Sequence, residues 1–271
     1  MAMSVQNNVS AMNAYRNLSN TQTNLSSSLE KLSSGFRINR AADDAAGLAI
    51  SEGLRSQIGG LNVAVRNAQD GISVVQTAEG ALNETHAILQ RMRDLSVQAS
   101  NTGALSDTAK GNIQAEIGQL AEGLTAIAEQ TKFNGTALLN GSYAGTFQVG
   151  ANVGEVIAVT ITQSMSAAGL SVAALDVTTG ATAAITAIDT AIDTVSKVRS
   201  DLGAKQNRLD HTINNLQVSV ENLTASESRI RDTDMANEMV SYTSSNILQQ
   251  AGTAMLAQAN QMPQSILSLL R

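Results

Sequence analysis

The chain has no cysteine, no tryptophan and a single proline, Pro263, among its 271 residues. Without cysteine it can hold neither a disulfide framework nor a thiolate metal site. Aromatic residues make up only 2% of the chain, which is little aromatic mass for the core of a compact α/β enzyme. The apolar content is mostly Ala, Leu, Ile and Val, a composition that favours long helices packed side by side.

Charge is scarce at both ends of the chain. Residues 1–29 carry one charged side chain, Arg16, and residues 239–270 carry none. Apolar residues nevertheless recur there at helical spacing, whereas a helix exposed to water normally keeps a charged outer face. We therefore predict that the two terminal segments are helices that pack against each other and against other copies of the chain.

Other absences narrow the class of protein further. The net charge of −6 and the lack of a basic patch with interleaved aromatics argue against a nucleic-acid partner. Residues 1–8 lack the basic and apolar regions of a signal peptide, and polar residues interrupt the uncharged segment 239–270 too often for a membrane span. We expect no membrane insertion. A chain without cysteine also suits export in an unfolded state through a narrow channel.

Recognisable catalytic motifs are absent from the sequence. It has no HExxH, no GxxxxGK[ST], no GxGxxG and no nucleophile elbow. The two histidines, His86 and His211, fit tolerated polar positions in a helical bundle. Asp43 and Asp44 precede an apolar run, where they favour the start of a helix rather than a paired-carboxylate site. We predict no enzyme, no cofactor and no metal site.

The middle of the chain predicts a helical rod with a small β region. Seams of apolar residues at steps of three and four run over 54–89 and 113–127, and a ladder with seven-residue spacing runs from Ile188 to Ile230. Turn signals and alternating residues predict a β-hairpin at about 143–162. The segment 163–182 is the least structured-looking part. The predicted fold class is mainly α, with long antiparallel helices forming a coiled-coil rod and both termini helical and paired.

Several strings resemble the N- and C-terminal signatures of bacterial flagellins. They cover most of residues 1–160 and 185–271, in the same order, and are far more specific than coiled-coil periodicity. The longest are LSSGFRINRAADDAAGLAISEGLRSQIGGLNVAVRNAQDGISVVQTAEGALNE (32–84), QRMRDLSVQASN (90–101), ENLTASESRIRDTDMANEMV (221–240) and NILQQAGTAMLAQANQMPQSILSLL (246–270).

The resemblance implies a structural subunit that polymerises into the extracellular flagellar filament for swimming. It implies an inner terminal coiled-coil domain (1–43 with 231–271), a rod domain (44–162 with 185–230) and a short variable outer connection (163–184). The residues expected at the subunit interface are apolar and lie in the two terminal helices: Val5, Val9, Met12, Leu18, Leu25, Leu29, Leu32, Leu248, Met255, Met262, Ile266 and Leu269.

The resemblance also implies partners besides other copies of the chain. These are the flagellar type III export apparatus, an export chaperone, and the filament cap and hook-junction proteins. A flagellin-recognising Toll-like receptor of animal hosts is a further implied partner, through Arg91, Leu95 and Glu116. Two alternatives stay open: a hook–filament junction protein, which shares the same end architecture, and a non-flagellar secreted coiled-coil protein.

Overall fold

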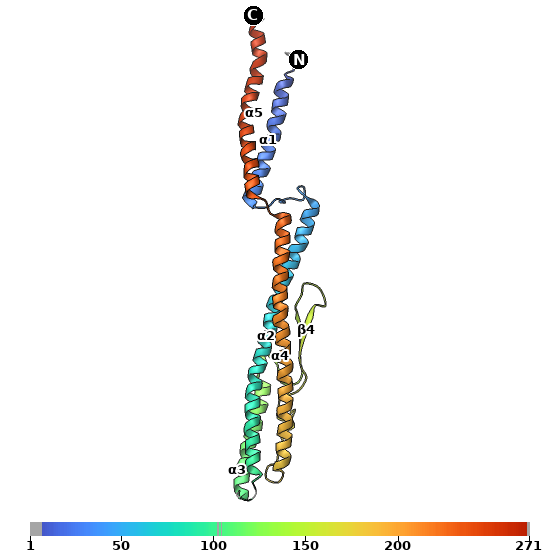
Figure 1. Cartoon of the computed structure of the whole chain (residues 1–271), viewed down its shortest axis with the longest axis vertical. Helices are drawn as coiled ribbons and strands as arrows, with labels where there is room; N and C mark the ends of the chain where they lie inside the picture. The colour runs from blue at the N-terminus through green and yellow to red at the C-terminus, as the bar shows by residue number, and fades with distance from the viewer. Residues whose placement is uncertain (1–6, 102, 104, 270–271) are drawn as a thin grey trace. The chain divides into compact units, whose positions relative to one another are not determined.

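The computed structural model describes residues 7–101, 103 and 105–269, with side chains up to residue 261. Most of this part of the chain is helical, which confirms the predicted fold class. Figure 1 shows the elements, which follow in the order α1 (Val9–Ser34), α2 (Ala45–Ala99), α3 (Asp107–Gln130), β1 (Lys132–Phe133), β2 (Thr136–Ala137), β3 (Tyr143–Gln148), β4 (Val156–Ile161), α4 (Ala181–Arg231) and α5 (Met235–Leu269).

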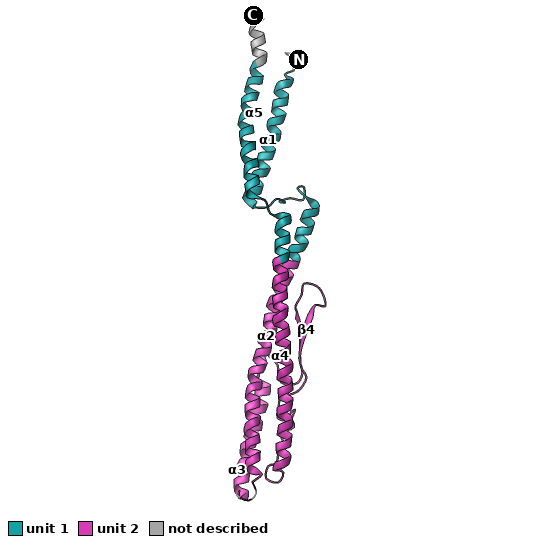
Figure 2. Ribbon diagram, in the orientation of Figure 1, with its two compact units in different colours: residues 1–56, 222–271 teal, residues 57–221 magenta. Residues whose placement is uncertain are grey.

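The chain divides into two compact units. Unit 1 comprises residues 1–56 and 222–271, and unit 2 comprises residues 57–221 (Figure 2). Helices α2 and α4 both continue from one unit into the other along the sequence.

Unit 2 has a core of aliphatic side chains from α2, α3 and α4. The predicted ladder lies in this core from Ile188 to Leu209, since these residues and Val195 and Leu202 are all at most 1% exposed. Its last members, Leu223 and Ile230, are only half-buried and belong to unit 1. Facing side chains on the other two helices, such as Leu89 of α2, are equally buried. Seven-residue spacing keeps one face of a helix against its neighbours, so the periodicity located this face correctly.

The predicted hairpin is present as the antiparallel pair β3–β4, in which Tyr143 pairs with Ile161 and Gln148 with Val156. Its side chains alternate, and β4 buries Ile157, Val159 and Ile161 while its other residues face solvent. One face of the hairpin therefore packs on the core of unit 2 and the other face is exposed to solvent.

The turn of this hairpin is fixed by the Glu155 carboxylate. It accepts hydrogen bonds from the backbone N–H of Asn152 (2.9 Å) and from its side-chain amide (3.2 Å), and these bonds lower the pKa of Glu155. A Cβ at Gly150 would lie 1.9 Å from Glu155 Oε2. Only glycine at position 150 leaves room for the carboxylate.

The segment 163–182, expected to be the least structured part of the chain, lacks regular structure up to residue 180 but is well packed. Residues 163–180 contain no helix or strand, yet the side chains of Met165, Ala167, Leu170, Val172 and Val177 are at most 5% exposed. The side-chain amide of Gln114 on α3 holds the segment as well, donating to the Leu175 carbonyl (2.7 Å) and accepting from the Val177 N–H (2.8 Å). Buried apolar contacts and backbone hydrogen bonds order the segment without regular structure.

Acid should weaken the turn before α4 through Asp176. The carboxylate of Asp176 accepts from the hydroxyls of Thr178 (2.5 Å) and Thr179 (2.7 Å), which lower its pKa from 3.8 to about 2. Because the folded pKa is lower than the unfolded one, the charged group stabilises the fold above pH 3.8, and this stabilisation is lost as the pH falls toward 2. The difference in melting temperature between the wild type and Asp176→Ala should therefore shrink across this window. In the double variant Thr178→Val/Thr179→Val, an NMR titration should show the Asp176 pKa closer to its ordinary value.

Candidate subunit interface

The helices α1 and α5 of unit 1 pack along each other, as predicted for the termini (Figure 1). Helix α1 begins where the Asn8 side chain accepts from the Ala11 N–H (3.0 Å), and it ends at Gly35, which adopts the left-handed conformation with φ 76°. The Asn8 amide also donates to the Ala259 carbonyl of α5 (2.7 Å). The residue that caps the N-terminus of α1 therefore also forms a hydrogen bond to α5.

The seam between these two helices is unusually small and polar. The residues that face the partner helix recur at steps of three and four, as in a coiled coil. On α1 they are Ala11, Ala14, Leu18, Thr21, Leu25, Ser28 and Leu32, and on α5 they are Glu238, Tyr242, Ser245, Gln249, Gly252, Leu256 and Ala259. The amide of Gln249 bonds Gln22 across the pair, and a Cβ at Gly252 would lie 3.2 Å from Leu18 Cδ1. Close approach of the backbones and amide contacts therefore alternate with a few large side chains along this seam.

The large apolar residues of α5 lie instead on its outer face. Val240, Ile247, Leu248 and Met255 are 70%, 61%, 56% and 66% exposed. At about 100° per residue, Val240 and Ile247 lie roughly opposite Gln249, so they point directly away from the seam. We call the exposed set Met239, Val240, Ile247, Leu248 and Met255 the outer stripe of α5.

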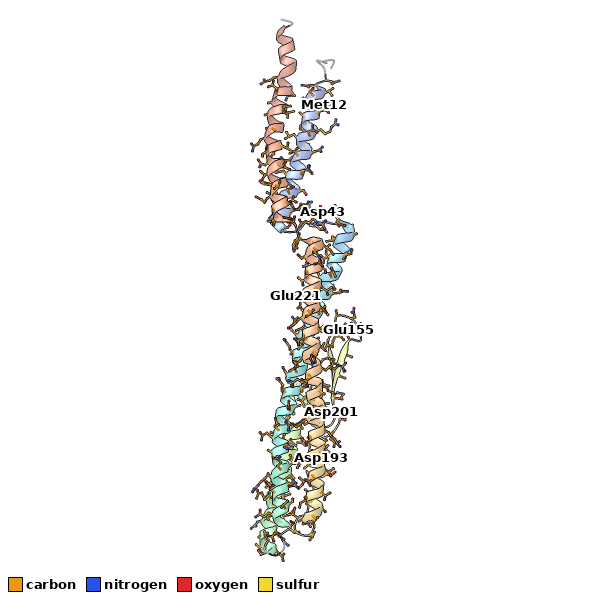
Figure 3. The ribbon with its side chains drawn as sticks, in the orientation of Figure 1. Met12, Asp43, Glu155, Asp193, Asp201 and Glu221 are labelled. Carbon is orange, nitrogen blue, oxygen red and sulfur yellow. The ribbon has the colours of Figure 1, made fainter. Side chains whose placement is uncertain are left out.

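Helix α1 carries a similar but shorter exposed apolar surface. Val9, Met12 and Tyr15 are each more than 60% exposed, and Figure 3 shows the side chains along both helices with Met12 labelled on α1. Two shallow grooves accompany these surfaces. One is lined on α5 by Met239, Val240, Thr243, Ser244, Ile247 and Leu248. The other is lined by Ala11, Met12, Tyr15, Arg16, Ser19 and Asn20 of α1 with Leu256 and Asn260 of α5. Burial would contribute about 1–2 kcal/mol for each half-exposed large side chain.

The predicted interface residues divide into two groups in the structure. Five are well exposed, namely Val9, Met12, Leu29, Leu248 and Met255, while Leu18, Leu25 and Leu32 are half-buried in the seam. The sequence reading missed Met239, Val240 and Ile247, although the seven-residue step from 240 to 247 could have identified that face. Val5 lies outside the described residues, as do the side chains of Met262, Ile266 and Leu269.

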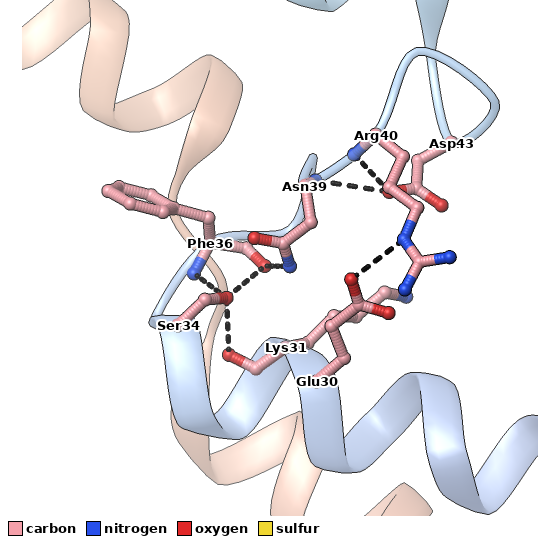
Figure 4. A network of polar contacts seen from close by, with 7 residues as sticks. All are labelled: Glu30, Lys31, Ser34, Phe36, Asn39, Arg40 and Asp43. Carbon is pink, nitrogen blue, oxygen red and sulfur yellow. Dashed lines mark hydrogen bonds and ion pairs between the residues drawn. The ribbon is translucent and has the colours of Figure 1, made fainter.

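A polar network orders the chain between α1 and α2 (Figure 4). The Asp43 carboxylate accepts from the backbone N–H groups of Asn39 (3.0 Å) and Arg40 (2.9 Å), which lowers the pKa of Asp43. The Arg40 side chain reaches back to Glu30 at 2.9 Å. Asp44 accepts from the Gly47 N–H (2.8 Å), which confirms its predicted place at the start of α2.

The same loop is joined to the segment between α4 and α5. The Arg37 N–H donates to the Arg231 carbonyl (2.6 Å), and the Thr233 N–H donates to the Gly35 carbonyl (3.0 Å). The guanidinium of Arg231 lies 4.7 Å from the centre of the Phe36 ring and 2.9 Å from the Glu52 carboxylate. Backbone bonds, a cation–π contact and an ion pair thus hold together the two chain segments from which α1 and α5 extend.

The residues expected at a receptor surface lie in unit 2. Arg91 of α2 contacts the Glu116 carboxylate of α3 through Nε (3.0 Å) and Nη2 (2.7 Å), and both side chains are exposed. Leu95 is only 3% exposed and belongs to the core. Its burial does not fit the expected role in receptor contact, because the periodicity of α2 turns position 95 toward α3 and α4.

Neither histidine lies in a cluster of possible metal ligands, and within the described residues no three His, Asp or Glu side chains are placed to hold a metal. His86 contacts Gln90 through Nε2 (2.9 Å), and His211 is exposed on α4. No helix in the described part of the chain is both long and apolar enough to cross a bilayer.

A helical core, a packed hairpin and paired terminal helices with an exposed apolar stripe define a subunit of the self-assembling class. The model of the bacterial flagellin N-terminal helical region matches residues 5–144, and that of the C-terminal helical region matches residues 185–270. The chain therefore belongs to the bacterial flagellin family.

Individual relatives agree with this assignment over their full length. A flagellin of Halalkalibacterium halodurans is 54% identical, and the match covers 99% of this chain and 100% of the relative. The flagellar filament 33 kDa core protein of Treponema phagedenis is 48% identical with the same coverage. The crystal structure of Bacillus cereus flagellin matches with a TM-score of 0.50 and 31% identity over 56% of this chain and 88% of that one.

Proposed function

We propose that the chain is the structural subunit of a helical flagellar filament that drives swimming, and that α1 and α5 build its contacts between subunits. The observation that carries this is the outer stripe of α5, which is uncharged and exposed beside a seam that is already filled. An uncharged apolar surface of this length is suited to being covered. A contact of different surfaces on successive copies, repeated around an axis, generates an open helical polymer.

The two terminal regions, 1–43 and 231–271, would form the inner layer of the filament. Residues 44–162 with 185–230 would form the surrounding rod layer, and 163–184 would face outward as the short connection. The core of unit 2 supports an independent rod, since it is formed without α1 or α5. With so short a connection, the rod layer itself would make most of the filament surface.

Folding of the termini would be coupled to assembly. Their seam buries few large side chains, so neighbouring subunits must supply the apolar contacts that order them. The chain would leave the cell unfolded through the flagellar type III export apparatus, escorted by an export chaperone. It would then be added beneath the filament cap, beyond the hook-junction proteins. We assign it no catalytic role.

Electron microscopy of the purified protein under polymerising conditions tests this function. Long filaments of uniform diameter are expected. A hook–filament junction protein would give short assemblies or none, and a non-flagellar coiled-coil protein would give no uniform helical filament. The full-length relatives, which carry the names flagellin and flagellar filament core protein, favour the filament subunit.

A Toll-like receptor of animal hosts is proposed as a second partner, which would bind at Arg91 and Glu116. Their ion pair is exposed, so both side chains could exchange this contact, worth at most about 1 kcal/mol, for one with the receptor. Arg91→Ala should lower signalling in receptor-bearing reporter cells by roughly tenfold or more, as expected for an anchoring arginine.

The matched control is Arg93→Ala on the same helix. Arg93 forms an ion pair with Asp189 at 2.6 Å and is similarly exposed. Equal loss of signalling in both variants, or no loss in either, would contradict a receptor site at Arg91.

A further inference from the structure

The methionines of this chain differ sharply between the two units. In unit 2, Met92 and Met165 are fully buried at 0% exposure. The described methionines of unit 1 all belong to the terminal helices and are largely exposed: Met12 (61%), Met235 (48%), Met239 (51%) and Met255 (66%). Because the sequence has no cysteine, methionine sulfur is the only sulfur that an oxidant can attack.

We propose that these exposed methionines are a modification site for peroxides in the free subunit, and that their oxidation blocks polymerisation. The proposal rests on the function proposed above. In the reaction, the thioether sulfur attacks one peroxide oxygen and the O–O bond breaks. One oxygen remains on sulfur as the sulfoxide and the other leaves as water, so methionine is oxidised by two electrons and hydrogen peroxide is reduced.

The location of the sulfurs makes assembly sensitive to this step. Met239 lines the groove on the outer face of α5, and Met255 lies on the same helix beyond Leu248. A sulfoxide converts a flexible apolar side chain into a polar one that keeps its hydrogen bonds only in water. Covering it with the apolar surface of a neighbouring subunit then carries the cost of an unpaired polar group. We expect each oxidised site to raise the critical concentration for polymerisation about tenfold.

Assembly would in turn protect the same sulfurs. In the filament the outer stripe of α5 is covered, so peroxide could reach Met239 and Met255 only in free subunits. The four exposed methionines of the terminal helices should react at least about tenfold faster than Met92 and Met165 in the free protein, because susceptibility follows exposure. In filaments this difference should largely disappear for Met239 and Met255.

The experiment treats the full-length purified subunit with hydrogen peroxide and measures sulfoxide at each methionine by peptide mass spectrometry. Polymerisation is then followed by sedimentation and electron microscopy. We expect selective oxidation of the terminal helices, loss of filaments, and recovery after treatment with a methionine sulfoxide reductase. The variant Met12→Leu/Met235→Leu/Met239→Leu/Met255→Leu should still polymerise after peroxide, whereas the control Met92→Leu should remain sensitive.

The outcomes separate this proposal from the proposed function. Untreated protein that forms no filaments would refute the function itself. Filaments formed equally well by oxidised and untreated subunits would overturn the oxidation site while leaving the function intact. Peroxide sensitivity that persists in the quadruple leucine variant would overturn it as well, because the responsible group would then lie elsewhere.

Discussion

Replacement of both Ile247 and Leu248 by aspartate is expected to abolish filament formation at any practical protein concentration. The two side chains are 61% and 56% exposed on the outer stripe of α5. In the folded subunit the new carboxylates would stay in water and cost little. In the filament they would be buried against an apolar, uncharged surface, at a cost of at least several kcal/mol for each unpaired charge. Sedimentation and electron microscopy of the double variant measure the result.

The matched control places one carboxylate on the flank of the same helix, as Thr253→Asp. Thr253 is exposed and lies roughly 40° around the helix from Gln249, between the seam and the side of the helix that carries Met239. This variant should polymerise with at most a modest rise in critical concentration. If Ile247→Asp/Leu248→Asp forms normal filaments, the outer stripe of α5 is not a contact between subunits.

Val172→Asp should unfold or severely destabilise unit 2, by about 3–5 kcal/mol, because it places an unpaired charge in a core. Val172 is 0% exposed although it lies in the segment 163–180, which has neither helix nor strand. Its backbone N–H also donates to the Ala167 carbonyl (2.8 Å), which fixes the chain reversal around it. Thermal and denaturant unfolding followed by circular dichroism would report the loss.

Val153→Asp makes the same chemical change at a fully exposed position, in the turn of the β3–β4 hairpin. It should change the free energy of unfolding by no more than about 0.5 kcal/mol. Comparable stability of the two variants would mean that residues 163–180 do not form part of the core and are instead the loose connection that their composition suggests.

Sequence periodicity located the helical core well and the connection poorly. The ladder from Ile188 to Leu209 was correctly assigned because a helix buried on one side must repeat its apolar residues about every seven positions. Residues 163–180 have no such repeat, since they form neither a helix nor a strand. The Gln114 amide, some sixty residues away along the chain, donates one hydrogen bond to this segment and accepts another, and neither could be predicted from the local sequence.

The candidate interface shows a different limit. Apolar residues in α5 were expected to mark a single face, but the structure exposes Leu248 and Met255 while Ala259 is 7% exposed within the seam. Small and polar residues occupy much of the seam, so hydrophobicity alone identified the outer face of α5 but not the face that packs on α1. The sequence motifs that resemble flagellins still identified the family. They depend on residue identity and not on which face of a helix is buried.

Because α2 and α4 continue through both units along the sequence, different parts of unit 1 should unfold in different ways. Residues 45–56 and 222–231 extend helices that are anchored in the core of unit 2. Extending an existing helix fixes one residue for each hydrogen bond, whereas starting a helix afresh carries a nucleation factor of about 10⁻³. These residues should therefore fray progressively toward the core. Helices α1 and α5 are separated from α2 and α4 by breaks in the helix at Gly35 and at residues 232–234, so they should melt as separate segments. The rate of amide hydrogen exchange should then fall gradually along residues 45–56 and 222–231 toward the core of unit 2. It should change abruptly at the boundaries of α1 and α5.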